Sequence, residues 1–306
     1  MNGRIGKPTF FIIIGIVILL SGSAMAKTSA TTKTSPKDTL KRMEYNGKLR
    51  GFLVHIPAHM DTDSKAPLLL VFHGLGGSGV QMRDLTKIEE TADKYGFITV
   101  FPDALCQTRI NQRIWNARGN DDLSDDVGFI NALLDYLIDS YGIDSKRIFA
   151  TGTSNGGMFS YRLLCELSHR ITAIAVNAAV DVFEGSCPNF VPRSILHIHS
   201  VNDPLVPIKG KKRRFFELPS VANTFKKWQE RLDCYQAPKV VLEDSLQLVK
   251  RYSHCKCSSE ILYYMTKDGG HGWPGSKPKF HFAMKTSSAF DMNELILSFF
   301  NGETLP

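Results

Sequence analysis

Short apolar runs alternate with amphipathic segments along most of the chain. The runs that read as strands, apolar throughout or alternating with period two, are residues 49–56, 67–72, 97–101, 147–151, 171–176, 194–199, 246–252 and 261–265. The segments with apolar residues at helical spacing are 85–95, 127–141, 158–167, 221–231 and 289–300. Because strands and helices alternate with short connections, the pattern predicts an α/β fold with a mainly parallel sheet and helices on both faces.

Turn and capping residues punctuate this pattern. Asn46-Gly47 predicts a hairpin turn before the first strand, and Gly96 and Gly142 stand where helices end. Ser124 is a plausible N-cap for the helix over 127–141. Residues 27–40 are rich in Ser, Thr and Lys, which predicts a flexible leader. Residues 41–306 are then expected to form a single catalytic domain.

The first 26 residues have the layout of a secretory signal peptide. Arg4 and Lys7 precede the apolar stretch 10–20, and Ala24-Met25-Ala26 offers a small-x-small cleavage site. The apolar stretch is too short for a good membrane span, so no stable membrane anchor is expected. We therefore expect a secreted protein, extracellular or periplasmic, after cleavage near Ala26.

Composition and charge narrow the classes of function. With 43% hydrophobic and 22% charged residues the chain can build a core, which excludes disordered and coiled-coil classes. The net charge of +7 becomes +5 when Arg4 and Lys7 are removed with the signal peptide. The densest basic run, Lys209 to Arg214, is expected to be a solvated loop of an exported protein, and no nucleic-acid partner is expected.

Six cysteines remain after the signal peptide, and export permits disulfides. Cys165 with Cys187, and Cys234 with Cys255, would each close a loop of moderate length, but six cysteines allow fifteen pairings. Cys255-x-Cys257 is too tight for a usual zinc site, so no metal is expected.

The strongest chemical motif is Gly152-Thr153-Ser154-Asn155-Gly156, which lies between a predicted strand and a predicted helix. A G-x-S-x-G sequence in that setting is typical of a nucleophile elbow, which exposes the serine hydroxyl on a sharp turn. Glycines two residues either side of the serine avoid collisions within that turn. We predict Ser154 as the nucleophile, with the Asn155 N–H directed at an oxyanion.

A serine nucleophile needs a base, and the base needs an orienting acid. Asp203 follows the carboxyl end of the strand over 194–199, and His271 lies in a glycine-rich loop further on. The order Ser, Asp, His is that of α/β-hydrolases. After the buried strand 67–72, the turn from His73 to Gly77 predicts a second oxyanion donor, the Leu75 N–H, with His73 bracing the loop. His197 and His199 share one face of their strand and are expected to be core or supporting residues, because no third metal ligand is near.

Together these motifs resemble the secreted feruloyl esterase and polyhydroxybutyrate depolymerase-like branch of the α/β-hydrolase superfamily. The resemblance runs from about residue 46 to 300. It is carried by LLLVFHGLGGSG (68–79), GFITVFPDA (96–104), DDVGFI (125–130), ATGTSNGGMFSYRL (150–163), HSVNDPLVP (199–207), LPSVANTFKKW (218–228) and GGHGWPG (269–275). It implies the same three residues as nucleophile, acid and base. It also implies the disulfides Cys165–Cys187 and Cys234–Cys255, which leaves Cys106 and Cys257 paired or free. Ser200 departs from the glycine that such proteins commonly have there.

The hypothesis from the sequence is a secreted serine carboxylic-ester hydrolase that needs no metal or organic cofactor. The resemblance allows two ester substrates, feruloyl-type esters of polysaccharides or polyhydroxyalkanoate chains. Trp115 and Trp273 are candidate stacking walls for an aromatic acyl group, with packing in the core as their alternative role. The rival functions are an inactive secreted binding protein on the same scaffold and a peptidase that uses the same triad.

Overall fold

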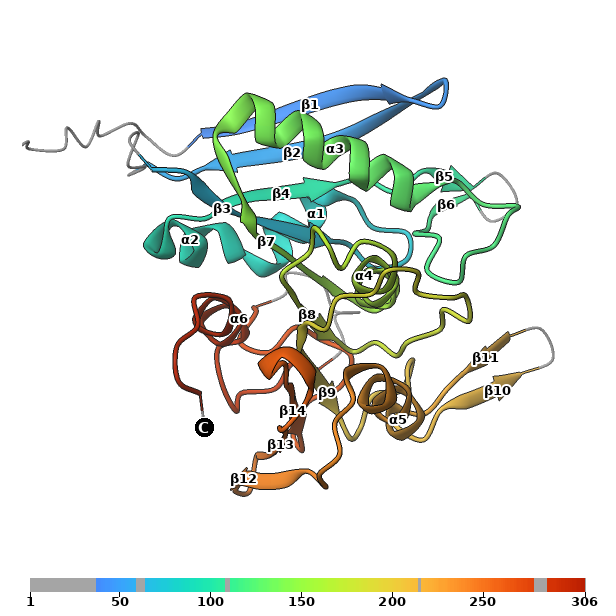
Figure 1. Cartoon of the computed structure of the whole chain (residues 1–306), viewed down its shortest axis with the longest axis vertical. Helices are drawn as coiled ribbons and strands as arrows, with labels where there is room; N and C mark the ends of the chain where they lie inside the picture. The colour runs from blue at the N-terminus through green and yellow to red at the C-terminus, as the bar shows by residue number, and fades with distance from the viewer. Residues whose placement is uncertain (1–36, 59–63, 108–110, 214–215, 278–284, 306) are drawn as a thin grey trace, which may run out of the picture.

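A mixed sheet runs through the centre of the protein (Figure 1). The computed structural model describes residues 37–58, 64–107, 111–213, 216–277 and 285–305. Within these residues the sheet has ten strands, in the spatial order β1 (Lys37–Tyr45), β2 (Lys48–Ile56), β4 (Ile98–Pro102), β3 (Ala66–Phe72), β7 (Ile143–Thr153), β8 (Ala173–Asn177), β9 (Ser194–Ser200), β14 (Ile261–Thr266), β13 (Gln247–Tyr252) and β12 (Lys239–Glu243). The six neighbouring strands from β4 to β14 run parallel to one another. On one side β2 pairs antiparallel with β4 and β1 with β2, and on the other side β13 pairs antiparallel with β14 and β12 with β13. The predicted mainly parallel sheet is confirmed.

Helices cover both faces of this sheet, as predicted. One face carries α3 (Asp126–Tyr141), α4 (Asn155–Glu166) and α5 (Val221–Leu232), and the other carries α1 (Gly79–Thr86), α2 (Ile88–Ala92) and α6 (Met292–Phe300). Strand β3 serves both cores: Leu68, Leu70 and Phe72 pack on the first, and Leu69 and Val71 on the second. This alternation explains why the strand is apolar at every position.

Shorter elements complete the described residues. They are the 3-10 helices η1 (Asp93–Tyr95) and η2 (Lys256–Ser258), and the strand pairs β5 (Cys106–Gln107) with β6 (Gln112–Arg113) and β10 (Lys211–Arg213) with β11 (Phe216–Leu218). Strand β10 takes up part of the basic run. Arg214, the last residue of that run, lies outside the described residues.

The domain begins earlier than the sequence suggested. Residues 37–40 were expected to belong to a flexible leader, but they lie in β1, where Lys37 pairs with Ile56 at the end of β2. The strand was missed because it is an exposed edge strand without a continuous apolar face. The predicted hairpin turn is confirmed, since Asn46 and Gly47 have φ of 49° and 69°. The predicted signal peptide and residues 27–36 lie outside the described residues.

Several predicted helix boundaries are wrong: α4 starts at Asn155 rather than near 158, and α6 starts at Met292 rather than at 289. The helix expected over 85–95 is split after Thr86, because Lys87 takes a left-handed conformation (φ 49°), and its first part starts at Gly79 behind the N-cap Ser78. The helix predicted behind Ser124 is capped by Asp125, whose side chain accepts the Gly128 N–H. Within the described ranges, no helix is both long and apolar enough to cross a membrane.

Two disulfides tie loops to the α3–α4–α5 face. Cys165 at the end of α4 is bonded to Cys187, and Cys234 after α5 is bonded to Cys255. Both pairs are those that the family resemblance implied. Cys106 and Cys257 are free and exposed.

Removing the first bridge is expected to destabilise the protein. The bond closes a loop with a sequence separation of 22, which corresponds to about 3 kcal/mol in the chain-entropy account of disulfide stabilisation. We expect the double variant Cys165→Ala/Cys187→Ala to lose about that free energy of unfolding, as measured by denaturant titration without reductant. Cys106→Ser, at a free and exposed position, is the control and should change it by less than about 0.5 kcal/mol. Equal stability of the two variants would contradict a stabilising role for the bridge.

Candidate active site

The predicted nucleophile stands on the turn between β7 and α4. Ser154 has φ 53° and ψ −123°, a strained conformation for a residue with a side chain, and its N–H donates to the Asn177 carbonyl on β8 (2.9 Å). Such a conformation costs about 1–3 kcal/mol and persists only where neighbouring structure enforces it. The turn therefore holds Ser154 at the carboxyl edge of the sheet, where sites of parallel α/β folds lie.

The two glycines of the motif are required by close backbone approach. A Cβ atom on Gly156 would lie 2.4 Å from the Phe72 carbonyl oxygen and 2.6 Å from that of His73. A Cβ on Gly152 would lie 2.6 Å from the carbonyl carbon of Gly156. The turn can thus form only if both positions lack a side chain, which agrees with the collision argument from the sequence.

The predicted base and acid meet in the structure. Nδ1 of His271 lies 2.7 Å from Oδ2 of Asp203, although 68 residues separate them. The other carboxylate oxygen of Asp203 accepts the N–H groups of Leu205 (2.9 Å) and Val206 (2.8 Å). Both carboxylate oxygens are therefore engaged, and His271 is held at a fixed orientation.

The charge state of Asp203 follows from these contacts. Burial opposes ionisation, but the hydrogen bond and charge of His271 and the Val206 N–H outweigh it and lower the pKa of Asp203 below its usual value. The acid is thus ionised across the neutral range and can only accept from His271. Within the described residues no other group bonds to Nε2 of His271, and the ring lines the pocket.

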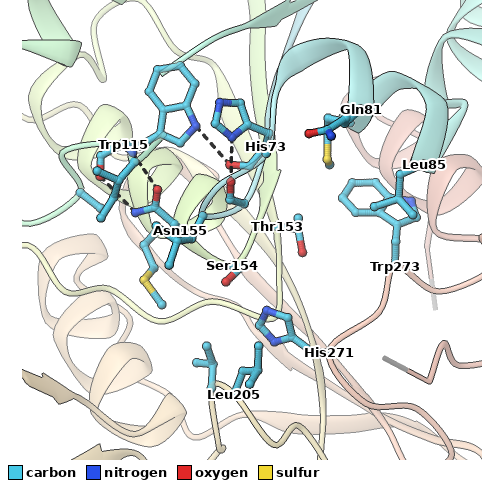
Figure 2. A pocket seen from close by; sticks show the side chains of 18 of the residues that line it. His73, Gln81, Leu85, Trp115, Thr153, Ser154, Asn155, Leu205, His271 and Trp273 are labelled. Carbon is cyan, nitrogen blue, oxygen red and sulfur yellow. Dashed lines mark hydrogen bonds between the residues drawn. The ribbon is translucent and has the colours of Figure 1, made fainter. Parts of the chain in front are cut away.

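Ser154 and His271 line the same cavity, which measures about 720 Å³. Figure 2 shows the Ser154 hydroxyl beside the imidazole of His271, with Leu205 below and Thr153 above. Apolar side chains dominate the wall, namely Leu75, Met82, Leu85, Ile114, Leu123, Met158, Val182, Leu205, Val206 and Leu218. The cavity can therefore hold an apolar group of considerable size against the serine.

Two backbone amides at the cavity are available to a ligand. Within the described residues, neither the Leu75 N–H nor the Asn155 N–H donates to another group of the protein. Asn155 is the first residue of α4, so its amide also carries the positive end of the helix dipole. Its side chain is fixed by two bonds to the Trp115 backbone, from N–H to Oδ1 (2.7 Å) and from Nδ2 to the carbonyl (3.1 Å).

His73 braces the glycine-rich turn that contains Leu75. Its Nδ1 donates to the Gly74 carbonyl (2.7 Å) and its Nε2 accepts the Ala104 N–H (3.1 Å). Burial lowers the pKa of His73, so the ring stays neutral as this bonding requires. The bracing role predicted from the sequence agrees with these contacts.

The two tryptophans do not offer free stacking surfaces. Trp115 is 1% exposed and stacks on Phe159 at a centroid distance of 4.9 Å. Trp273 is 2% exposed and donates its indole N–H to Asn293. Both border the cavity and are packed against the protein, so a stacking role toward an acyl group stays a prediction. The exposed large side chains on the cavity are instead Leu75, Leu85 and Leu205.

The basic run reaches the edge of this site. Leu218 of β11 lines the cavity, and the Glu217 carbonyl accepts a hydrogen bond from the guanidinium of Arg118, another lining residue. The exposed Lys212 on β10 pairs with the Glu217 carboxylate (3.4 Å). Residues 211–213 of the run thus form a short strand beside the cavity, and none of its described residues, 209–213, belongs to the cavity wall.

Three supporting contacts were not foreseen from the sequence. Asn177 donates from its side chain to the Gly272 carbonyl (3.1 Å) and so ties the histidine loop to β8. A buried pair, Arg50 with Asp126 (2.8 Å), fixes the loop before α3, because Asp126 also accepts the Asn116 N–H (2.8 Å). Tyr161 bonds to His197, a contact that no local pattern signals because the partners are 36 residues apart.

Comparison with known families places the chain among ester-cleaving enzymes. A family model described as phospholipase/carboxylesterase matches residues 59–236, more than half of the chain. A solved acetyl xylan esterase from Aspergillus awamori superposes with a TM-score of 0.61 at 14% identity, over 85% of this chain and 99% of that one. At that identity the superposition shows a shared fold.

Curated relatives carry related names. Feruloyl esterase B of Piromyces equi is 27% identical over 247 residues, which is 78% of this chain and 45% of the relative. A probable feruloyl esterase C of Aspergillus terreus is 29% identical, over 61% of this chain and 66% of the relative. A bifunctional acetylxylan esterase/xylanase of Neocallimastix patriciarum is 28% identical, over 56% of this chain and 25% of the relative. The match thus spans between a quarter and two thirds of these relatives' lengths.

Proposed function

The chain belongs to the phospholipase/carboxylesterase family of α/β-hydrolases, and we propose that it is a secreted serine hydrolase of carboxylic esters. The observation that carries the proposal is the arrangement at the elbow. Ser154 stands beside His271 at an apolar cavity, and His271 is bonded to a buried carboxylate at 2.7 Å. A serine on a strained turn, beside a histidine that an ionised aspartate orients, is the arrangement that a serine nucleophile requires.

The chemistry follows from the positions of these groups. His271 takes the Ser154 proton at Nε2 as the hydroxyl oxygen attacks the ester carbonyl carbon. The resulting oxyanion accepts the free N–H groups of Leu75 and Asn155. When the intermediate collapses, His271 returns the proton to the leaving alcohol and an acyl-enzyme remains. Water then gives a proton to Nε2 of His271 as its oxygen attacks the acyl carbon. When this second intermediate collapses, His271 returns the proton to the Ser154 oxygen and the acid leaves. Asp203 stabilises the imidazolium in both halves.

We infer that the acyl group is a feruloyl-type group esterified to polysaccharide. The named relatives support this class of ester, and the apolar side chains around Ser154 provide contact for an aromatic acid. The wall presents leucine and methionine and not free indole faces, so binding would rest on burial of the ring rather than on stacking.

Export is part of the same proposal. The N-terminal sequence has the layout of a signal peptide, and the disulfides Cys165–Cys187 and Cys234–Cys255 suit an oxidising compartment.

Labelling and substrate comparison test the proposal. We expect a fluorophosphonate probe to label the folded protein at Ser154, and methyl ferulate to be hydrolysed with a kcat/KM at least about tenfold above that of a 3-hydroxybutyrate trimer, equal to about 1.4 kcal/mol in transition-state binding. A folded protein that is not labelled would point to a binding protein on a hydrolase scaffold. Labelling with equal, weak turnover of both esters would retain the serine hydrolase and reject the feruloyl substrate.

A further inference from the structure

A chain of buried side chains connects the helix that follows Ser154 to the loop that carries Asp203. The Tyr161 hydroxyl on α4 lies 2.7 Å from Nδ1 of His197 on β9. Nε2 of His197 lies 3.2 Å from Nδ1 of His199, two residues further along the strand. Nε2 of His199 lies 2.7 Å from the Val206 carbonyl oxygen. The two imidazoles are nearly parallel, with 9° between their planes.

The donors in this chain all point the same way. A carbonyl oxygen can only accept, so Nε2 of His199 carries its proton and Nδ1 of a neutral ring accepts. His197 must then donate from Nε2 and accept at Nδ1, which makes the Tyr161 hydroxyl the first donor. Each group therefore fixes the tautomer of the next.

Burial keeps all three groups neutral. Tyr161 is 1% exposed, and His197 and His199 are fully buried. Burial lowers the pKa of both histidines and raises the pKa of Tyr161, so each holds the number of protons that the chain needs. The titratable groups that face this hydrogen-bond chain are Asp203 and His271 at the His199 end, and Asp181 and Tyr263 near Tyr161.

The hydrogen-bond chain ends at the Val206 peptide group, which also binds the Asp203 carboxylate. The Val206 carbonyl accepts from His199, and the Val206 N–H donates to Oδ1 of Asp203. Nε2 of His199 also lies 3.6 Å from Oδ2 of Asp203, the oxygen that His271 uses. Because His199 is neutral and directs its only N–H to Val206, it does not compete as a cation for this carboxylate.

We propose that Tyr161, His197 and His199 are positioning residues, whose directed hydrogen bonds hold Val206, and through it the Asp203 carboxylate, in register with His271. The inference rests on the proposed function, since positioning matters only if Asp203 serves the serine. It also links two parts of the site, because Tyr161 belongs to α4, the helix that follows Ser154.

Two substitutions at His199 test the last step of the hydrogen-bond chain, the bond to Val206. His199→Leu removes the donor to Val206, and we expect kcat on p-nitrophenyl butyrate to fall on the order of 10- to 100-fold while KM stays the same. His199→Gln can still donate an amide N–H to Val206 and accept from His197, so it should restore kcat to within a few fold. A folded His199→Leu protein with wild-type kcat, or a Gln variant as impaired as the Leu variant, would overturn the proposal.

A second pair of more conservative variants tests the start of the hydrogen-bond chain, at Tyr161. This pair tests the positioning role even if His199→Leu does not fold. Tyr161→Phe removes only the first donor and should lower kcat on the order of 2- to 10-fold at unchanged KM. Tyr263→Phe is the matched control, because Tyr263 packs edge-on against His197 (5.5 Å) and its hydroxyl has no hydrogen bond within the described residues. Equal kcat in the two variants would overturn the proposal.

Labelling separates the failure of this inference from failure of the proposed function. If the wild type binds no fluorophosphonate and hydrolyses no ester, the serine-hydrolase proposal itself fails. If the wild type is labelled and active and the Tyr161 and His199 variants match it, only the positioning role is rejected.

Discussion

Ser154→Ala is expected to lower kcat for ester hydrolysis on the order of 10⁴-fold or more, with the fold intact. The loss follows from the proposed route, because no other hydroxyl can replace the one that the elbow presents beside His271. Alanine fits the same backbone position at little steric cost, so substrate binding and the melting temperature should change little. The measurement is kcat on p-nitrophenyl butyrate, together with thermal unfolding.

Ser160→Ala is the matched control for that variant. Ser160 lies on the same helix and is fully buried, but its hydroxyl donates to the Gly156 carbonyl (2.9 Å) and does not line the cavity. We expect its kcat to stay within a few fold of the wild type. Appreciable esterase activity in Ser154→Ala would reject the assignment of the nucleophile.

The turn that carries Ser154 was predictable because all of its defining residues are close together in the sequence. Gly152, Ser154 and Gly156 lie within five residues, and the close approaches to the Phe72 and His73 carbonyls admit no other residue at the glycine positions. The acid and base were predictable for a related reason, since each follows the end of a parallel strand and such ends gather at one edge of the sheet. The parallel order of the sheet followed from the alternation of apolar runs and amphipathic helices.

What could not be predicted depends on how distant elements pack. The chain from Tyr161 to Val206 exists only because α4 lies on the same face of the sheet as the two histidines of β9. The sequence shows that His197 and His199 share a face but not which residue of α4 they meet. The packing of Trp115 was hidden in the same way, since its stacking on Phe159 buries the ring at the border of the cavity.

The start of β1 and the break after Thr86 were predicted wrongly for a different reason. Strand β1 has no buried apolar face, so periodicity could not separate residues 37–40 from a flexible leader. The break after Thr86 depends on a left-handed Lys87, a conformation that lysine sequences do not signal. The backbone of β1 is set by its pairing with β2 rather than by the local pattern of side chains.

Asp203→Asn is expected to lower kcat on the order of 10³- to 10⁴-fold, even though the side chain keeps its shape. The reason is that the two carboxylate oxygens of Asp203 have different partners. Oδ1 accepts the N–H groups of Leu205 and Val206, so an asparagine would keep its carbonyl oxygen there and turn its NH₂ group toward His271. His271 would then have to accept at Nδ1 and carry its proton on Nε2, the nitrogen that must take the proton of Ser154.

Asp93→Asn provides a control for loss of one partly buried negative charge that is paired with a histidine. Asp93 bonds to Nε2 of His55 (2.8 Å) and is not among the residues of the cavity, so kcat should be retained even if stability falls. The comparison uses kcat, KM and fluorophosphonate labelling of both variants. Slow labelling and low kcat in Asp203→Asn, with KM unchanged, are expected because substrate contacts remain while the base holds the wrong tautomer. If Asp203→Asn retained wild-type kcat, Asp203 would be a turn-forming residue, and another group would have to orient His271.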